Sequence, residues 1–197
     1  SIFGTCKDAH NKFPNRVIET PLSENMLTGM CAGLGQNGYR PVFVHARADF
    51  SFLTFEHIVN TLAKWRYIHN LQPMPVVIRM IVGRGWGQGP KHSQAPHAMF
   101  AHVPGLRVFM PFTPNDAYWG LRAALSQEDP VIFLEHRALY ETDGTVSASK
   151  FAPARAYWGS GRMYHLGQDA LIIGISAVLN ECLEAGQRLY MDHGIDV

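Results

Sequence analysis

The sequence has few cysteines and few charged residues for its length. Its 197 residues include three cysteines, Cys6, Cys31 and Cys182, and no C-x-x-C pair. They are too few and too irregularly spaced for a disulfide framework, which favours reduced thiols in an intracellular protein. Lysine and arginine number 17, and aspartate and glutamate 16, so that the formal net charge is +1. This balance gives no electrostatic reason to expect nucleic acid or an anionic membrane as a partner.

Long apolar runs are absent as well. The longest, ALIIGISAVL at 170–179, is too short to cross a bilayer, and no basic-then-apolar leader follows Ser1. We therefore expect no membrane partner and a cytoplasmic protein, or one of the mitochondrial matrix if the source is eukaryotic. The composition, 47% hydrophobic and 17% charged, is that of a globular protein with a sizeable core. The low charge also suggests a surface partly covered by other subunits.

Short apolar runs alternate with longer amphipathic stretches. The runs predict strands at 16–20, 41–45, 75–80, 106–110 and 130–135. The stretches between them predict helices at 23–36, 52–70, 95–102 and 115–127, the last opened by the capping sequence TPND. The runs are apolar along their whole length, as in strands with helices on both faces. The sequence thus predicts an α/β fold with a mostly parallel sheet.

Three regions follow from the change of pattern along the chain. Residues 1–145 carry the alternation and form the main domain. Residues 146–167 lie in a polar stretch rich in glycine and proline and predict a connector. Residues 168–197 restart as strand and helix and stop at a second strand, so we expect the beginning of a further, incomplete domain.

Glu24 stands at the mouth of a helix that the sequence predicts to be buried. A carboxylate in the first turn can simply complement the helix dipole and face the solvent. Alternatively, burial can keep it partly protonated, so that it donates a hydrogen bond. The sequence around the residue leaves both interpretations open.

A glycine-rich segment, GRGWGQG at 83–89, follows the strand predicted at 75–80. It matches neither a P-loop nor a dinucleotide fingerprint. Ligands of parallel sheets gather beyond the carboxyl ends of the strands, where this segment would present His92, Ser93 and Gln94. Histidines recur here every five residues, which builds no zinc-binding face. Phe50, which follows the strand predicted at 41–45, would lie at the same edge.

Four segments in this order resemble one known family. They are TPLSE, ADFSFLTFEHIVN, HSQAPHAMFAHVPGLRVFMP and DPVIFLEHRALY. The chain resembles the beta subunit of thiamine-diphosphate-dependent 2-oxoacid dehydrogenases, the decarboxylating component of the pyruvate and branched-chain complexes. More distantly, it is similar to the pyrimidine-binding domain of transketolase. The last 29 residues resemble the start of the family's carboxy-terminal domain, which continues far beyond Val197.

The resemblance assigns roles to several residues. It implies that Glu24 hydrogen-bonds the aminopyrimidine of thiamine diphosphate, so that the cofactor can lose the proton of its thiazolium carbon. It implies that Phe50 packs on the pyrimidine ring, with apolar contact from Leu22 and Met26. His92 matches the histidine that orients the substrate and assists proton transfer.

The family often binds a structural potassium ion, and the resemblance gives its position here. The matching residues are Val76, Ala124, Leu125, Gln127 and Asp129. The last two replace the Asp and Asn that the family commonly has. A glutamine oxygen ligates a hard cation without bringing charge, so the chain has a weaker set of ligands than the family.

The other half of the cofactor site is expected on another chain. The family holds the diphosphate through magnesium with a G-D-G…N motif, and the only Asp-Gly here, Asp143-Gly144, lacks the downstream asparagine. The resemblance therefore implies an alpha subunit that supplies the diphosphate and magnesium half-site, in an alpha2beta2 assembly. Arg84, Trp86 and Lys91 are bulkier than the residues usual in the family's glycine loop, and could narrow the substrate entrance.

Three functions stay open at this level. The first is oxidative decarboxylation of a 2-oxoacid with transfer of the acyl group to a lipoyl acyltransferase. The second is a split carbon–carbon ligase of the transketolase or synthase type. The third is a truncated homologue without catalysis, against which the presence of Glu24, Phe50 and His92 argues.

Overall fold

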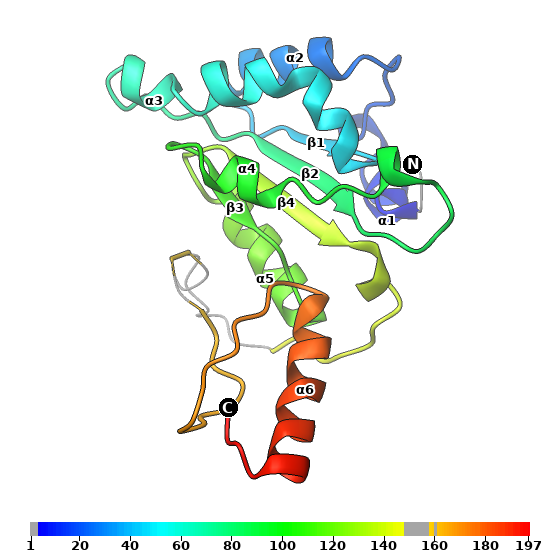
Figure 1. Cartoon of the computed structure of the whole chain (residues 1–197). Coiled ribbons are helices and arrows are strands. Elements are labelled where there is room, and N and C mark those ends of the chain that lie inside the picture. Colours follow the sequence, from blue (N-terminus) through cyan, green and yellow to red (C-terminus); the bar gives the residue numbers. More distant parts are fainter. Residues whose placement is uncertain (1–3, 148–157, 160) are drawn as a thin grey trace.

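A parallel sheet forms the centre of the molecule (Figure 1). The computed structural model describes residues 4–147, 158–159 and 161–197. Its four strands lie in the order β1-β2-β4-β3, and all neighbours run parallel. They are β1 (Val42–His45), β2 (Val77–Val82), β3 (Arg107–Phe109) and β4 (Val131–His136). The predicted α/β fold with a mostly parallel sheet is confirmed, and so are four of the five predicted strands.

Helices and single helical turns precede, connect and follow the strands. They are α1 (Lys7–Lys12), η2 (Pro14–Arg16), α2 (Glu24–Gln36), η3 (Ala48–Thr54), η4 (His57–Leu62), α3 (Trp65–Ile68), η5 (Pro90–His92), α4 (His97–Ala101), α5 (Pro114–Leu125), η6 (Arg137–Leu139) and α6 (Val178–His193). Among the described residues, no helix combines the length and the apolarity that crossing a membrane requires.

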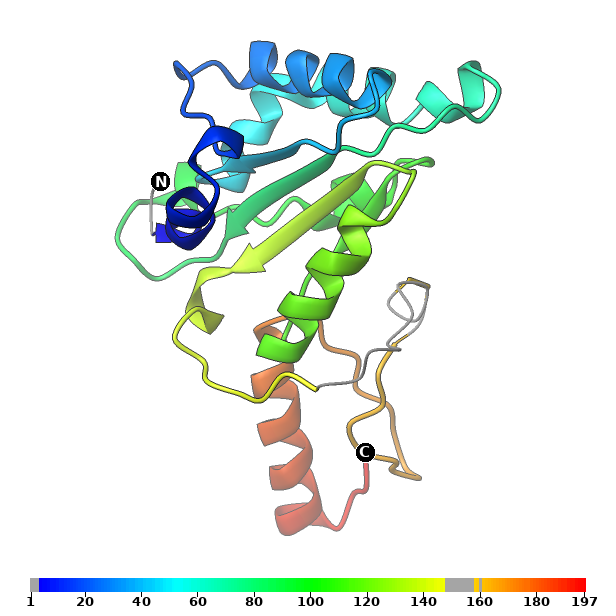
Figure 2. The ribbon, with the colours of Figure 1, turned by 180° about the vertical axis from the view of Figure 1, so that it is seen from behind.

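Alternate residues of the central strands serve two cores, one on each face of the sheet. Ile78, Met80 and Val82 belong to the larger core, which α2, η4 and α4 cover. Val77 points to the opposite face, where α5 covers it (Figure 2). Strands buried on both faces are apolar throughout, which is why the sequence shows runs without alternation.

Helix α5 begins where its sequence predicts. The Thr113 hydroxyl accepts a hydrogen bond from the Asp116 N–H at 3.1 Å, and the Asp116 carboxylate accepts one from the Thr113 N–H at 3.1 Å. This capping box satisfies two N–H groups that a helix start otherwise leaves open.

The prediction of one continuous helix over 52–70 is wrong. The structure divides it into the 3-10 helix η3, the π-helix η4 and the short α3. The Ala63 N–H donates to the Ile58 carbonyl oxygen at 3.0 Å, a bond that spans five residues and widens the turn. Apolar spacing predicted that this segment is buried, but it does not distinguish these three kinds of turn.

The strand predicted at 16–20 is also wrong. In the part of the chain that the structure describes, these residues pair with no strand, and the side chain of Ile18 is 75% exposed. The strand predicted at the start of 168–197 is not formed in the described residues, although the Asp169 N–H donates to the Asp196 oxygen at 2.8 Å; the helix predicted after it is α6. The three-region division stays a prediction, and residues 148–157 and 160 of the connector lie outside the described residues.

Candidate active site

The carboxyl ends of β1 and β2 and the start of α2 meet at one edge of the sheet. Parallel strands place their carboxyl ends together. Two segments therefore begin at this edge: η3, which follows β1, and the glycine loop (residues 83–89), which follows β2. The Asn25 side-chain amide donates to the Leu53 carbonyl oxygen at 3.3 Å and ties the start of α2 to η3. Residues from three separate stretches of sequence are thereby gathered in one place.

Glu24 is the first residue of α2, and only 9% of its surface is exposed. Its main-chain oxygen accepts a hydrogen bond from the Thr28 hydroxyl at 2.9 Å. In the part of the chain that the structure describes, its carboxyl group has no hydrogen-bond partner. The residue as a whole is largely buried, so this open carboxyl group is placed to bond a ligand or another chain. The solvent-facing interpretation of Glu24 is therefore the weaker one.

Phe50 and His92 lie against each other at this edge. Their ring centroids are 5.6 Å apart and the ring planes cross at 62°, an edge-to-face arrangement. Phe50 belongs to η3, after β1, and His92 closes η5, after β2. The Nδ1 atom of His92 is buried without a hydrogen-bond partner among the described residues. An aromatic ring and an imidazole from two different loops are thus brought together at this edge.

Asp49 holds the two loops together, which the sequence did not reveal. One carboxylate oxygen, Oδ1, accepts hydrogen bonds from the Gln94 N–H at 3.2 Å and from the Gln94 side-chain amide at 2.8 Å. Asp49 is 8% exposed. Its position next to Phe50 in the sequence was the one available signal.

Leu22 and Met26, on either side of Glu24, point outward. Their side chains are 86% and 53% exposed. The structure therefore gives them no buried contact, and apolar contact with a cofactor stays a prediction. Large exposed apolar side chains around a buried carboxylate are typical of a surface that a partner covers.

The glycine loop folds around Trp86. Gly83, at φ +134°, lies so close to the indole that an added Cβ would be 2.6 Å from it. The guanidinium carbons of Arg47 and Arg137 lie 4.9 and 4.8 Å from the centre of the ring, and Arg47 also donates to the side-chain oxygen of Gln88. Burial, and next the charge of Arg137, lower the pKa of Arg47. Trp86 is thus fixed at the carboxyl edge; whether it narrows a substrate entrance stays a prediction.

His45, at the carboxyl end of β1, is a buried histidine that sequence reasoning missed. It is 3% exposed, and neither ring nitrogen has a hydrogen-bond partner within the described residues. Its ring lies 4.3 Å from that of Phe43. Desolvation lowers its pKa from 6.5 to about 4, so the ring is neutral at neutral pH. A strand-end histidine within an apolar run gave no signal of its own.

The oxygen atoms matched to a potassium site are already engaged by other groups of the chain. The carbonyl oxygens of Leu125 and Gln127 accept hydrogen bonds from Arg40 Nη1 at 3.0 and 2.6 Å. The carboxylate of Asp129 is shared by two guanidinium groups, at 2.7 and 2.6 Å.

The remaining two positions are engaged as well. The Val76 oxygen accepts from the Val131 N–H at 2.9 Å, and the Ala124 oxygen from the Gln127 N–H at 3.2 Å. As arranged, these residues do not fit a potassium ion, and we derive no function from one. Nor do the described residues contain a group of three or more His, Cys, Asp and Glu side chains arranged to hold a metal.

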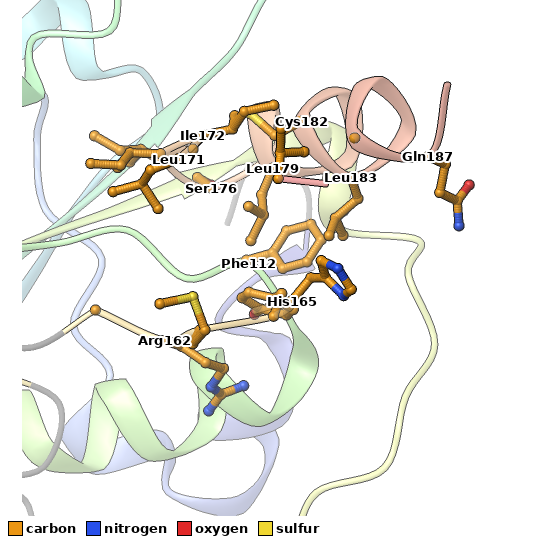
Figure 3. A pocket seen from close by; sticks show the side chains of 18 of the residues that line it. Phe112, Arg162, His165, Leu171, Ile172, Ser176, Leu179, Cys182, Leu183 and Gln187 are labelled. Carbon is orange, nitrogen blue, oxygen red and sulfur yellow. The ribbon is translucent and has the colours of Figure 1, made fainter. Parts of the chain in front are cut away.

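A broad hollow lies away from this edge, between residues 161–176 and α6 (Figure 3). Apolar side chains such as Phe112, Leu179 and Leu183 line it. Its charged groups are already paired, since Arg162 contacts Asp116 at 3.0 Å and His165 contacts Asp196 at 2.7 Å. The charged side chains described in the hollow thus pair with one another, unlike the carboxyl group of Glu24.

Comparison with known proteins agrees with the motifs. The acetoin:2,6-dichlorophenolindophenol oxidoreductase subunit beta of Cupriavidus necator is 35% identical over 189 residues, which are 95% of this chain and 55% of that protein. The pyruvate dehydrogenase E1 component subunit beta of Leifsonia xyli is 38% identical over 175 residues, 88% of this chain and 51% of its own. The 2-oxoisovalerate dehydrogenase subunit beta of Bacillus subtilis is 35% identical over 179 residues, with coverages of 90% and 54%. The chain spans about half the length of these relatives.

A solved structure and a family model agree with this result. The structure, of a split gene transketolase as an inactive beta4 tetramer, matches with a TM-score of 0.77 and 25% identity over 98% of this chain and 59% of that one. Residues 1–142 match the family model described as the transketolase pyrimidine binding domain. The resemblance to beta subunits of 2-oxoacid dehydrogenases is thereby confirmed, and the chain belongs to the family of the transketolase pyrimidine-binding domain.

Proposed function

We propose that this chain provides the pyrimidine-binding half of a thiamine-diphosphate-dependent 2-oxoacid dehydrogenase, as its beta-type subunit. The observation that carries the proposal is the carboxyl group of the largely buried Glu24, which has no hydrogen-bond partner within the described residues, at the edge where Phe50 meets His92. The residues fit the pyrimidine end of the cofactor: a carboxyl group for a ring nitrogen, and an aromatic side chain for the ring itself.

Glu24 acts as the group that holds a proton at the pyrimidine. The start of α2 fixes its direction, and burial keeps water from competing for the hydrogen bond. When bound, thiamine diphosphate supplies the carbon that adds to the 2-oxo group and takes up the electron pair released with carbon dioxide. Phe50 packs on the pyrimidine ring, and its orientation is held by the loop contacts around it.

His92 faces the substrate in this proposal. Its Nδ1 atom is buried and has no hydrogen-bond partner among the described residues, and its ring is supported from one side by Phe50. An imidazole in this position can orient the carboxylate or oxo group of the substrate and can give or accept a proton. The lipoyl group of an acyltransferase would then take up the acyl group as a thioester, its disulfide accepting the two electrons that this oxidation releases.

The other half of the site comes from a partner chain. The proposal places the diphosphate and Mg²⁺ on an alpha-type subunit, in an alpha2beta2 assembly of the cytoplasm or the mitochondrial matrix. Two observations support the division: the sequence carries no G-D-G…N motif, and the described residues around Glu24 include the exposed Leu22 and Met26, which such a partner would cover.

A second candidate is a split carbon–carbon ligase, favoured by the similarity to the split gene transketolase. Co-expression with a candidate diphosphate-binding subunit separates the two. The dehydrogenase proposal predicts release of carbon dioxide from a 2-oxoacid that depends on thiamine diphosphate and Mg²⁺, and on the presence of both chains. Transfer of a two-carbon unit between sugar phosphates, without 2-oxoacid decarboxylation, would instead establish the ligase.

A further inference from the structure

The segment that carries His92 depends on a distant side chain for its position. Four glycines with positive φ, at 83, 85, 87 and 89, precede it in a seven-residue stretch. Because glycine adopts many backbone conformations, a loop this rich in glycine is held in one conformation only weakly by its own backbone. Local bonds close only the turn itself, where the His92 N–H donates to the Gly89 oxygen at 3.2 Å and the Ser93 hydroxyl to the same oxygen at 2.9 Å.

Asp49 provides the connection to the rest of the fold on the far side of His92, whereas Arg47 and Arg137 hold the glycine-rich part through Gln88 and Trp86. Its Oδ1 atom receives both the main-chain and the side-chain N–H of Gln94, at 3.2 and 2.8 Å. Hydrogen bonds to a carboxylate are about twice as strong as those between neutral groups, and the burial of Asp49 limits competition from water. A side-chain and a main-chain donor on one oxygen fix both the place and the direction of the loop.

The two residues that this contact joins are neighbours of the aromatic pair. Asp49 immediately precedes Phe50 in η3, and Gln94 stands two positions after His92. The contact thus crosses from the segment after β1 to the segment after β2, beside the point where the rings meet at 5.6 Å. Phe50 and His92 cannot both keep their places if these two loops move apart.

We propose that Asp49 and Gln94 are positioning residues, which hold His92 against Phe50 and so set the geometry of the substrate end of the site. The catalytic consequence rests on the proposed function, whereas the geometric consequence does not. A displacement of about 1 Å at a catalytic group can cost about 10²-fold in rate. We therefore expect loss of the contact to lower kcat about 10- to 100-fold in the assembled enzyme, with a smaller change in KM.

The geometric part is tested in the chain itself by NMR of the histidine rings. The ring current of Phe50 shifts the resonances of His92, and Phe50→Leu defines the size of this shift. Gln94→Ala and Asp49→Ala are expected to abolish most of it, while the exposed loop variant Lys91→Ala leaves it unchanged. An unchanged His92 shift in correctly folded Gln94→Ala and Asp49→Ala would overturn the proposal.

A paired exchange separates positioning from a general loss of structure. Gln94→Glu sets two carboxylates against each other and is expected to lose the shift. The double variant, which carries Asp49→Asn and Gln94→Glu, again pairs an amide with a carboxylate, with the amide now at position 49. It is expected to recover both the shift and kcat. A double variant that stays as displaced as Gln94→Glu alone would contradict the proposal. If the shift follows the contact but no variant of the complex decarboxylates a 2-oxoacid, the proposed function fails and the positioning role stands.

Discussion

The ring of His92 meets the ring of Phe50 edge to face, with the centroids 5.6 Å apart and the planes at 62°. The two residues follow different strands, β1 and β2, and only the parallel arrangement brings them together. The buried Glu24 opens α2 at the same edge. This relationship gives a carboxyl group, an aromatic face and an imidazole in one place, which is the basis of the proposed site.

Replacement of His92 tests its role at the substrate. We expect His92→Asn to lower the rate of 2-oxoacid decarboxylation by the assembled enzyme about 10²-fold, because general acid–base and orienting groups contribute on this scale. The exposed His102 offers a matched control, and His102→Asn should retain the activity. Equal rates for wild type and His92→Asn would remove His92 from the site.

The stability of the chain should fall on acidification because of His45. The pKa of this buried ring is lowered from 6.5 to about 4, so the unfolded chain takes up the proton at a higher pH than the folded chain. Its contribution to stability is therefore fully present above pH 6.5 and is lost as the pH falls toward 4. The free energy of unfolding should decrease by up to about 3 kcal/mol over this window.

Chemical denaturation at several pH values measures the effect of His45. The variant His45→Leu cannot titrate at this position, so its stability should depend less steeply on pH between 6.5 and 4. Identical pH dependences for wild type and variant would mean that the His45 ring is solvated or hydrogen-bonded in the folded chain.

Two glycines should respond in opposite ways to an added methyl group. Gly105 has φ +97°, and an added Cβ would stand 1.9 Å from the Ala63 carbonyl oxygen, so Gly105→Ala should lose about 3 kcal/mol or more of the free energy of unfolding. A Cβ added at Gly33, inside α2, would have no heavy atom of another described segment within 4 Å. Gly33→Ala should therefore raise the free energy of unfolding by about 0.5–1 kcal/mol. Denaturant titration of both variants checks the pair, and a tolerated alanine at 105 would contradict the described packing of that loop on η4.

The three thiols should differ in reactivity. Burial raises the pKa of Cys31 to about 11, so very little of it is thiolate at pH 8, and its side chain lies in the larger core. Cys6 and Cys182 are partly exposed. A disulfide reagent should modify two thiols quickly in the folded chain and the third only on unfolding, and Cys31→Ser should leave the fast phase intact. Rapid modification of all three in folded wild type would show that α2 opens readily.

Four of the strands, and their burial on both faces of the sheet, could be predicted because both depend on composition over a few residues. Runs such as PVVIRM are apolar on both faces, and only a covered parallel sheet accommodates them. The run at 16–20, RVIET, has only Val17 and Ile18 as apolar residues, and it pairs with no strand in the part of the chain that the structure describes. The π-helical turn within 52–70 depends on a hydrogen bond that spans five residues, from the Ala63 N–H to the Ile58 carbonyl oxygen.

The candidate site was predictable where a residue follows a strand or opens a helix. Phe50 and His92 could be placed at the carboxyl edge from their order in the sequence, whereas Glu24 was predicted only at the start of a helix and its role came from the family resemblance. The contact between Asp49 and Gln94 could not, because it depends on the path of two loops rather than on either sequence alone. Stacking of two arginines on Trp86 was missed for the same reason.

The central claim is that the carboxyl group of Glu24 serves the pyrimidine end of the cofactor. The most direct test is kcat for 2-oxoacid decarboxylation by the co-purified complex, for wild type, Glu24→Gln and the exposed control Glu141→Gln. Gln keeps the size of the side chain but neither holds nor releases the proton. We expect a loss of about 10²- to 10⁴-fold for Glu24→Gln alone, with the complex still assembled. Equal turnover by wild type and Glu24→Gln would contradict it.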